Sequence, residues 1–526
     1  MALTLPYTPD QLADVVRKVD VPQDFLWGVA TAGYQAEGGF NGPDDIKNNW
    51  YGWEGKNGRD VTGKASDFWN QYPGDFDRAQ WMGLNTFRMG IEWARVQPCA
   101  DPTRRFTDPP DFDEKAFDDY VTIILEARKR GLEPIITLLH FTTPLWVGPD
   151  FWLEGPKVED LFGPYVNFTI ESINNRLVDK HGQPPIKYWV TLNEPFMLAS
   201  ATYLFRMFPT HATRAQLAAA RLAYENILIG HILAYRGIHA LYAGKRWERP
   251  TITFNSWASR IYSIDKMAQD LMVARTLGLK KEQVRPYLAE CRERFTDRVE
   301  KTRQPRDLDP LRRLADKAID AYVWKRLNPV TMPRVLHAVF EDYQESRLLD
   351  AVSFDYYDPY TSNYLKTQGG LGIRVQPWDW TSNPASFCDF LHAYSAPNHG
   401  LPLMVLENGF GIRGKTAQGV PRFDGARRID GLRGHLYGLL KAMSEGVNVK
   451  AFCHWTITDN YEWGSFEPRF GLFAVDYLNG AKRLPVDALG DNAAGAYRAF
   501  VTALRSGDKD RILAAFKGEG LESYPG

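Results

Sequence analysis

Two glutamates stand out because each closes a short apolar run just before a turn signal. Glu194 lies in Thr-Leu-Asn-Glu-Pro at 191–195, and Glu407 lies in Leu-Glu-Asn-Gly at 406–409. Carboxyl groups on opposite sides of one pocket can supply a proton donor and a nucleophile or base, which cleavage of a glycosidic bond requires. A single glutamate at a strand end is more often an ordinary rim residue, so the pair must be judged with the elements that carry it.

Eight short apolar or β-branched runs alternate with longer amphipathic stretches along the chain. The runs cover residues 25–32, 86–93, 133–140, 187–194, 250–257, 351–357, 401–408 and 449–456, and the stretches at 113–130 and 425–444 have helical spacing. Strands that alternate with helices predict parallel βα units, so we expect an α/β protein with a (β/α)8 TIM barrel. A doubly wound open sheet is the alternative, but no G-x-G-x-x-G follows the first run.

The chain of 526 residues is longer than a minimal barrel, and two regions account for the excess. Residues 34–65 are rich in Gly, Asn and Trp and predict a long βα loop. Residues 259–346 separate the fifth and sixth runs and contain charged, helical stretches. We expect one barrel domain over residues 1–526, with a helical insertion at 259–346. A separate small domain there is the alternative.

Polar or aromatic side chains stand at or just beyond the ends of these runs. In a barrel the carboxyl ends of the strands share one face, and the fourth and seventh strands lie across from each other. The residues are Gln35, Glu37, Arg88, Glu92, His140, Asn193, Glu194, Asp355, Tyr357, Glu407, Asn408 and Trp455. We therefore expect one active site at that face.

Composition excludes several classes of function. The chain carries 63 basic and 64 acidic residues, so no basic field favours nucleic acid as a partner. Its four cysteines are far apart and form no C-x-x-C, and no metal or nucleotide motif occurs, so we expect no metal and no cofactor. The N-terminus does not resemble a signal peptide, and no apolar run approaches membrane-spanning length. These features predict a cytoplasmic protein without membrane insertion.

Six blocks in this order resemble glycoside hydrolase family 1, the β-glucosidase and β-galactosidase family. They are residues 25–35 (FLWGVATAGYQ), 87–93 (FRMGIEW), 191–195 (TLNEP), 407–409 (ENG), 454–463 (HWTITDNYEW) and 469–472 (RFGL). The resemblance extends from about residue 25 to residue 500 and independently implies a TIM barrel.

The resemblance also implies a role for each matched residue. Glu194 would be the general acid and base, and Glu407 the nucleophile of a mechanism that retains anomeric configuration. Arg88 and Tyr357 would support Glu407, and Asn193 would reach the sugar 2-hydroxyl. The residues that would bind the remaining sugar hydroxyls, or stack on the sugar in the case of Trp455, are Gln35, His140, Trp455, Glu462 and Trp463.

Several positions depart from the family pattern. Asp355 stands where the family usually has Asn, and Phe141 replaces a more common Trp. Residues 464–470 lack the Ser-x-Lys-x-Tyr arrangement of the 6-phospho-glycosidase branch, which favours an uncharged sugar. Glu194 is not Gln, which argues against the thioglucosidase branch.

Together these observations predict a retaining exo-β-glycosidase that hydrolyses terminal β-D-glucosides, with β-galactosides and β-fucosides as secondary substrates. Its partner would be a small-molecule β-glycoside or an oligosaccharide. Two alternatives stay open, a transglycosylase that uses the same covalent intermediate and a non-catalytic sugar-binding barrel. The natural aglycone and the oligomeric state are not determined by the sequence.

Overall fold

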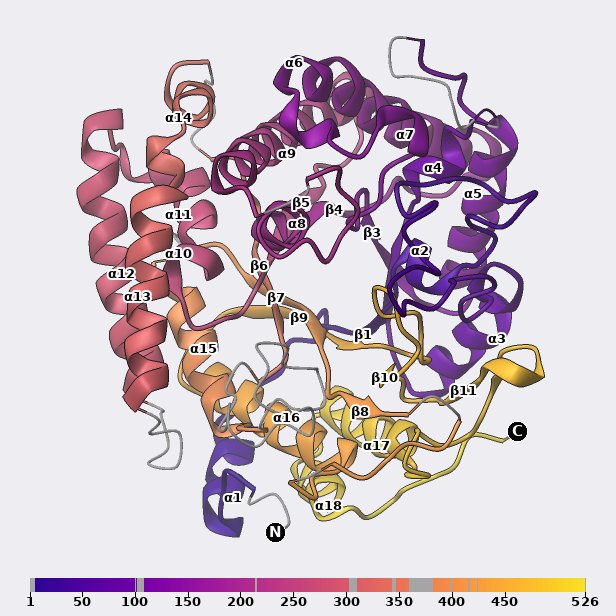
Figure 1. Cartoon of the computed structure of the whole chain (residues 1–526). Helices are drawn as coiled ribbons and strands as arrows, with labels where there is room; N and C mark the ends of the chain where they lie inside the picture. The colour runs from indigo at the N-terminus through magenta and orange to yellow at the C-terminus, as the bar shows by residue number, and fades with distance from the viewer. Residues whose placement is uncertain are drawn as a thin grey trace.

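The computed structural model describes residues 5–99, 101, 108–212, 215–301, 310–342, 347–358, 382–397, 400–414, 417–422 and 424–525. Eight parallel strands form a closed barrel, seen end-on in Figure 1. They are β1 (Leu26–Ala30), β2 (Thr86–Gly90), β3 (Glu133–Thr137), β4 (Tyr188–Asn193), β5 (Thr251–Trp257), β6 (Val352–Tyr356), β7 (Leu403–Asn408) and β9 (Val449–Trp455). Each falls within one of the eight expected runs, so the predicted TIM barrel is confirmed.

The barrel closes because its first strand pairs with both the second and the last. Gly28 of β1 lies opposite Thr86 of β2 on one side and Cys453 of β9 on the other. Almost every strand residue is buried, which explains why the strands appear in the sequence as continuous apolar runs. The pairing is irregular near the carboxyl ends of β4, β6 and β7, the strands that lead to the two glutamates and Asp355.

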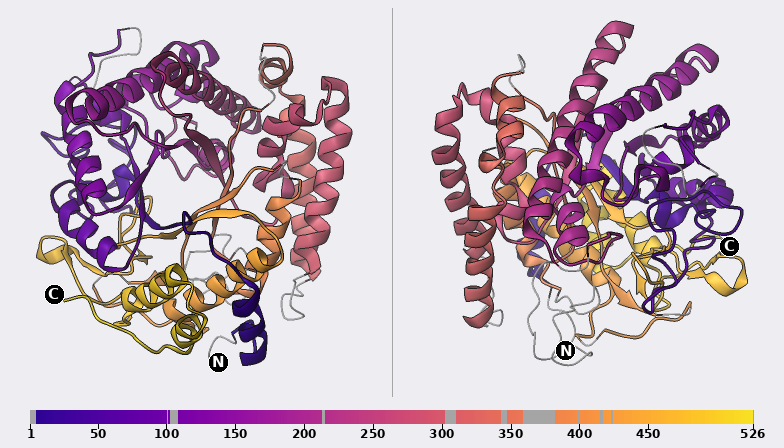
Figure 2. Two further views of the ribbon diagram at one scale, coloured as in Figure 1. Left: turned by 180° about the vertical axis from the view of Figure 1, so that it is seen from behind. Right: turned by 45° about the horizontal axis from the view of Figure 1, so that its top comes forward.

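Helices surround the barrel, as the view from behind in Figure 2 also shows. The predicted helix at 113–130 is α5 (Glu114–Lys129), which Asp113 caps by accepting from the backbone N–H groups of Lys115 and Ala116. The others outside 259–346 are α1 (Pro9–Lys18), α2 (Gly33–Ala36), α3 (Phe68–Trp81), α4 (Trp93–Val96), α6 (Gly155–Lys157), α7 (Gly163–Asn175), α8 (Pro195–Tyr203), α9 (Leu217–Lys245), α15 (Ala385–Ser395), α16 (Arg428–Ser444), α17 (Ala493–Ser506) and α18 (Lys509–Lys517). Two small antiparallel sheets pair β8 (Ile412–Arg413) with β10 (Pro468–Arg469) and β11 (Val475–Asp476) with β12 (Lys482–Arg483).

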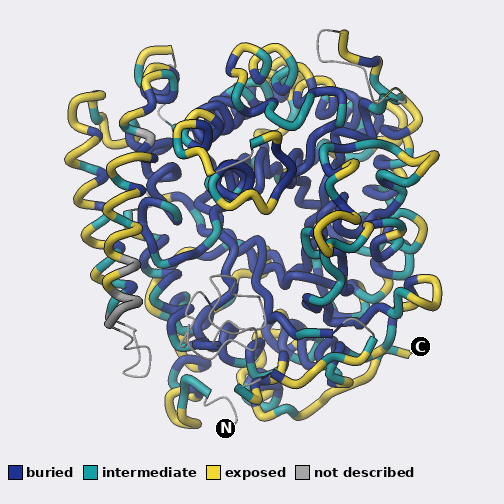
Figure 3. The backbone as a smooth tube through the Cα atoms, viewed as in Figure 1, coloured by how far each residue is buried: buried dark blue, intermediate teal, exposed yellow. Residues whose placement is uncertain are grey.

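The segment between β5 and β6 is helical where it is described, and residues 302–309 and 343–346 of it lie outside the described part. Its helices are α10 (Tyr262–Asp265), α11 (Met267–Val273), α12 (Val284–Lys301), α13 (Pro310–Arg326) and α14 (Pro333–Phe340). Helix α12 packs against α11 and α15, and α13 packs against α10. Figure 3 shows that the outer faces of α12 and α13 are exposed, whereas the barrel strands are buried.

The expected long loop at 34–65 is mostly irregular, apart from the single helical turn of α2. It is nonetheless well packed, because Tyr34, Phe40 and Trp50 are fully buried. Among the described helices, none combines the length and the apolar character needed to cross a bilayer. Cys99, Cys291, Cys388 and Cys453 form no disulfide bond.

Candidate active site

The two glutamates face each other at the carboxyl end of the barrel. Glu407 is in β7, and Glu194 follows β4 directly, at the position that caps α8. One carboxylate oxygen of each, together with one of Asp355, lies within 4.8 Å of the others. The side chain of Glu194 makes no hydrogen bond to the start of α8, so it is not used as a helix cap.

Glu194 has a left-handed backbone conformation, with φ of 42°. Non-glycine residues rarely adopt this region, and residues held there often lie at functional sites. Pro195 begins α8 immediately afterwards. The sharp change of direction between strand and helix places the Glu194 side chain at the barrel mouth.

Both oxygens of Glu407 have a partner from a different strand or loop. Arg88 Nη1 donates to Oε1 at 2.5 Å, and the Tyr357 hydroxyl donates to Oε2 at 2.6 Å. Arg88 also donates through Nη2 to Asn193 Oδ1 at 2.6 Å. The fully buried Arg88 therefore fixes the residue beside Glu194 relative to Glu407.

The surroundings of the two glutamates favour different protonation states. Burial raises the pKa of Glu407, while the charge of Arg88 and the hydrogen bonds from Tyr357 and Arg88 counteract that rise. Burial, followed by the negative charge of Glu407, raises the pKa of Glu194 to about 8, although a hydrogen bond with Asp355 and the charge of Arg88 oppose part of that rise. Since Arg88 contacts Glu407 directly, the site favours a protonated Glu194 beside an ionised Glu407 at neutral pH.

A second group of residues lines the same mouth around Glu462. Trp455 Nε1 donates to Glu462 Oε1 at 3.0 Å, and Gln35 Nε2 donates to Oε2 at 3.0 Å. The half-buried Glu462 has its pKa raised to about 8, chiefly by burial. An acceptor of this kind between two fixed donors suits recognition of sugar hydroxyls.

Aromatic rings form a wall beside Glu462. The His140 ring is stacked with Trp455 at 5.8 Å and with Trp463 at 5.9 Å between centroids, with interplanar angles of 8°. Phe141, noted as a departure from the family, packs edge-on against Trp463 at 5.1 Å. Burial lowers the pKa of His140 well below its usual value, so its ring is neutral. Its Nδ1 has no hydrogen-bond partner among the described residues.

The structure brings the residues that the family resemblance assigned to the site to one mouth, whereas Glu37 pairs with Arg95 and Glu92 accepts from Thr142. The sequence analysis missed one member of the network. Asn255 in β5 is fully buried, and its Nδ2 donates to Asn193 Oδ1 at 2.6 Å and also to Asp355 Oδ2. The available signal was an amide inside a run of apolar strand residues. That signal alone does not say whether the side chain faces the barrel interior.

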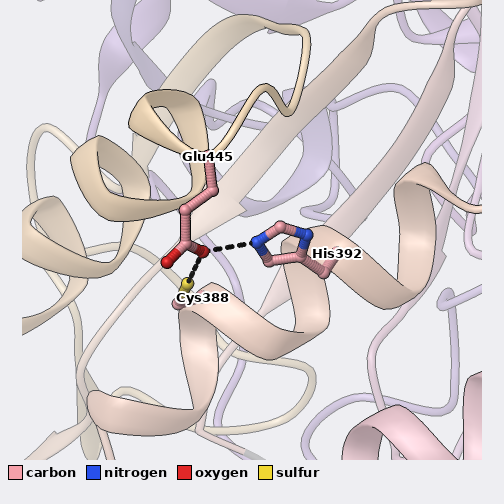
Figure 4. Close-up of side chains that lie close together, drawn as sticks. All are labelled: Cys388, His392 and Glu445. Atoms are coloured by element: carbon pink, nitrogen blue, oxygen red, sulfur yellow. Dashed lines mark hydrogen bonds and ion pairs between the residues drawn. The ribbon is translucent and has the colours of Figure 1, made fainter. Parts of the chain in front are cut away.

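Two groups of side chains among the described residues have the composition of a metal site. Glu194, Asp355 and Glu407 form one, and the guanidinium of Arg88 pairs with Glu407 of this group. Cys388, His392 and Glu445 form the other, between α15 and the end of α16 (Figure 4). His392 Nε2 lies 2.7 Å from Glu445 Oε2, and the ammonium of Lys441 pairs with Glu445 and lies 3.8 Å from Cys388 Sγ. These contacts form a hydrogen-bonded ion-pair network.

Comparison with known proteins identifies the family. Residues 17–281 and 321–488 match the model for glycosyl hydrolase family 1. The chain belongs to this family. This confirms the resemblance drawn from the six sequence blocks. Residues 282–320, which include α12 and the first part of α13, lie outside the matched ranges.

Individual relatives within the family differ in the substrates that their names state. The 6-phospho-beta-galactosidases of Staphylococcus aureus strains JH9 and Mu50 are 25% identical over 487 residues, which cover 87% of this chain and 94% of theirs. The family 1 β-glucosidase from Thermotoga maritima is 20% identical, with a TM-score of 0.61 over 93% of this chain and 98% of that one. The AHE enzyme from Alicyclobacillus herbarius is also 20% identical, with a TM-score of 0.63 over 95% and 99%. The two solved structures support the fold.

Proposed function

We propose that this family 1 glycosidase is a retaining exo-β-glycosidase that hydrolyses terminal, uncharged β-D-glucosides, with β-galactosides and β-fucosides as secondary substrates. The observation that carries the mechanism is the separation of the two glutamates, whose nearest oxygens lie within 4.8 Å. Retaining glycosidases hold their carboxyl groups roughly 5–5.5 Å apart, whereas inverting ones need about 6.5–9.5 Å to admit a water molecule. The close spacing supports the retaining route.

In the first step, a carboxylate oxygen of Glu407 bonds to C1 of the sugar while the bond from C1 to the leaving oxygen breaks. Glu194 gives its proton to that oxygen, so the aglycone leaves as a neutral alcohol. Arg88 and Tyr357 hold Glu407 in position for attack. The raised pKa of Glu194 keeps the proton available at neutral pH.

In the second step, Glu194 acts as a base because it is now ionised. It takes a proton from water while the water oxygen bonds to C1 and the ester bond to Glu407 breaks. The sugar leaves with its original configuration after two inversions. An alcohol or sugar in place of water would give the transfer reaction.

The glycone is proposed to bind between Glu462 and the aromatic wall. Gln35, His140, Asn193, Glu462 and Trp463 would contact hydroxyl groups, and Trp455 would stack on the apolar face of the sugar ring. The hydrogen bonds from Gln35 and Trp455 to Glu462 support this assignment because they fix the acceptor before substrate binds.

An uncharged sugar is favoured over a 6-phosphorylated one. The segment 464–470 lacks the Ser-x-Lys-x-Tyr arrangement expected around a sugar phosphate. It carries instead Glu467, whose Oε2 lies 3.7 Å from Arg413 Nε. A phosphate dianion beside the Glu467 carboxylate would be repelled.

The test is a matched panel of 4-nitrophenyl β-glycosides, namely glucoside, galactoside, fucoside and the 6-phosphates of the first two. We expect the glucoside to have the highest kcat/KM and both phosphates to be cleaved at least about 100-fold more slowly. Each 1.4 kcal/mol of repulsion lowers kcat/KM about tenfold, so a repulsion of about 3 kcal/mol gives this factor. Faster cleavage of a phosphorylated substrate would overturn the glycone assignment while leaving the family unaffected.

A further inference from the structure

Asp355 is a third carboxyl group in the active site, and its contacts differ from those of the two glutamates. It is fully enclosed, whereas Glu194 keeps 9% of its surface exposed toward the mouth. It lies in β6 directly opposite Glu407 of β7, next to an irregularity in their pairing. One of its oxygens lies within 4.8 Å of an oxygen of each glutamate.

Only one side of the Asp355 carboxyl group has a donor. Oδ2 accepts from Asn255 Nδ2, whereas Oδ1 has no hydrogen-bond partner among the described residues when Asp355 is treated as a carboxylate. A buried carboxylate oxygen without a donor is costly, because desolvation is not compensated. A proton between Asp355 and the neighbouring Glu194 would give one carboxyl oxygen of each residue a hydrogen-bond partner.

The charges around the pair also require a proton there. Arg88 is the cation that faces these carboxyls, and its guanidinium is already engaged by Glu407 and Asn193. The titratable groups packed around the pair from the neighbouring elements are Arg88 of β2, Glu407 of β7, Cys453 of β9, Tyr394 of α15, and Tyr357 and Glu462 of the loops. If Glu194 and Asp355 were both ionised, one buried cation would face three buried anions.

We propose that Glu194 and Asp355 share a single proton at working pH, so that a carboxyl pair rather than Glu194 alone holds the proton given to the leaving group. This inference rests on the proposed glycosidase function. Burial and the charges of Glu407 and Glu194 raise the pKa of Asp355 well above its usual value, in agreement with a retained proton. Asp355 is a positioning residue, because it acts through Glu194.

The net charge of the buried carboxyl groups and Arg88 is the same after the proton has been transferred. Transfer to the leaving oxygen ionises both members of the pair, while Glu407 becomes a neutral ester. The charge of Arg88 is then released from Glu407 and can balance the second anion. Glu194 recovers its proton from the attacking water, and the shared state is restored when Glu407 leaves as a carboxylate.

The test is the pH dependence of kcat/KM in Asp355→Asn, with two β-glucosides of different leaving groups. Phenyl β-glucoside needs protonation of its leaving oxygen, whereas 2,4-dinitrophenyl β-glucoside does not. Loss of the last proton from the wild-type pair leaves two carboxylates side by side. Their repulsion raises the pKa of that last proton. We expect Asp355→Asn to lower the alkaline-limb pKa for phenyl glucoside by about one pH unit or more. Activity on the dinitrophenyl substrate should be retained and should show that the variant is folded.

Asp265→Asn is the matched control. Asp265 of α10 is another buried carboxyl with its pKa raised to about 7, and it is hydrogen-bonded to Ser259 outside the pair. Its replacement should leave the alkaline limb unchanged. Asp355→Ser serves as a second variant that removes the carboxyl if the amide variant does not fold.

The possible outcomes separate the two proposals. An alkaline limb in Asp355→Asn that is unchanged or moved to higher pH overturns the shared proton, while hydrolysis by the wild type still supports the glycosidase. An equal shift in Asp265→Asn also overturns it, because the effect would then follow from any buried charge. Absence of hydrolysis of both substrates by the wild type overturns both proposals.

Discussion

At the scale of single residues, Arg88 determines how the two glutamates differ. Its guanidinium binds Glu407 and Asn193 at 2.5 and 2.6 Å, so it opposes the burial that raises the pKa of Glu407. We predict that Arg88→Met raises the pKa of the acidic limb of kcat/KM by about one pH unit or more, because Glu407 must be ionised to attack. We also expect kcat/KM at neutral pH to fall at least about 100-fold. An unchanged acidic limb would contradict this role.

The alkaline limb of the wild-type profile reports on the proton donor. The pKa of Glu194 is raised to about 8 by burial and by Glu407, so the acid form persists through neutral pH and is lost above that value. We predict that kcat/KM for phenyl β-glucoside falls about tenfold per pH unit above pH 8. Glu194→Gln should abolish this limb together with most of the activity on phenyl glucoside. A wild-type profile that stays flat to pH 10 would exclude Glu194 as the acid.

At the scale of elements, the strands and both glutamates could be predicted because parallel, buried strands leave a strong apolar signal. Asn255 could not be predicted in the same way, since its partners Asn193 and Asp355 come from strands far away in the sequence. The hydrogen bond from Gln35 to Glu462 spans 427 positions and depends equally on closure of the barrel. Contacts of this kind follow from register and strand pairing, which a single sequence does not reveal.

Helix α12 lies outside the family match, yet it supports β6, the strand that carries Asp355. Phe295 packs edge-on against Tyr394 of α15 at 5.7 Å, and Tyr394 stacks on Phe354 of β6 at 4.0 Å, next to Asp355. We predict that Phe295→Ala destabilises the protein by about 3–5 kcal/mol, because it leaves a cavity in this stack. The measurement is the midpoint of thermal unfolding. Leu314→Ala is the control, since Leu314 on α13 is 67% exposed and its loss should change little.

At the scale of the whole molecule, a ligand that binds only the folded barrel must stabilise it. We predict that D-glucose, the product of the proposed reaction, stabilises the protein by ~2.7 kcal/mol at 100 times its dissociation constant. Thermal unfolding with and without the ligand measures the effect. Glu462→Ala should reduce the stabilisation by the same ligand concentration. An equal stabilisation in this variant would argue against the proposed glycone site.

The family and the barrel follow from sequence blocks and spacing, whereas the close approach of Glu194, Asp355 and Glu407 emerges only in three dimensions. The most direct test of the central claim is to follow hydrolysis of 4-nitrophenyl β-D-glucoside by proton NMR and record which anomer of the sugar appears first. The account predicts the β-anomer, with the α-anomer arising later by mutarotation, and no product with Glu407→Ala. Initial release of the α-anomer, or wild-type rates from Glu407→Ala, would contradict the retaining glutamate pair.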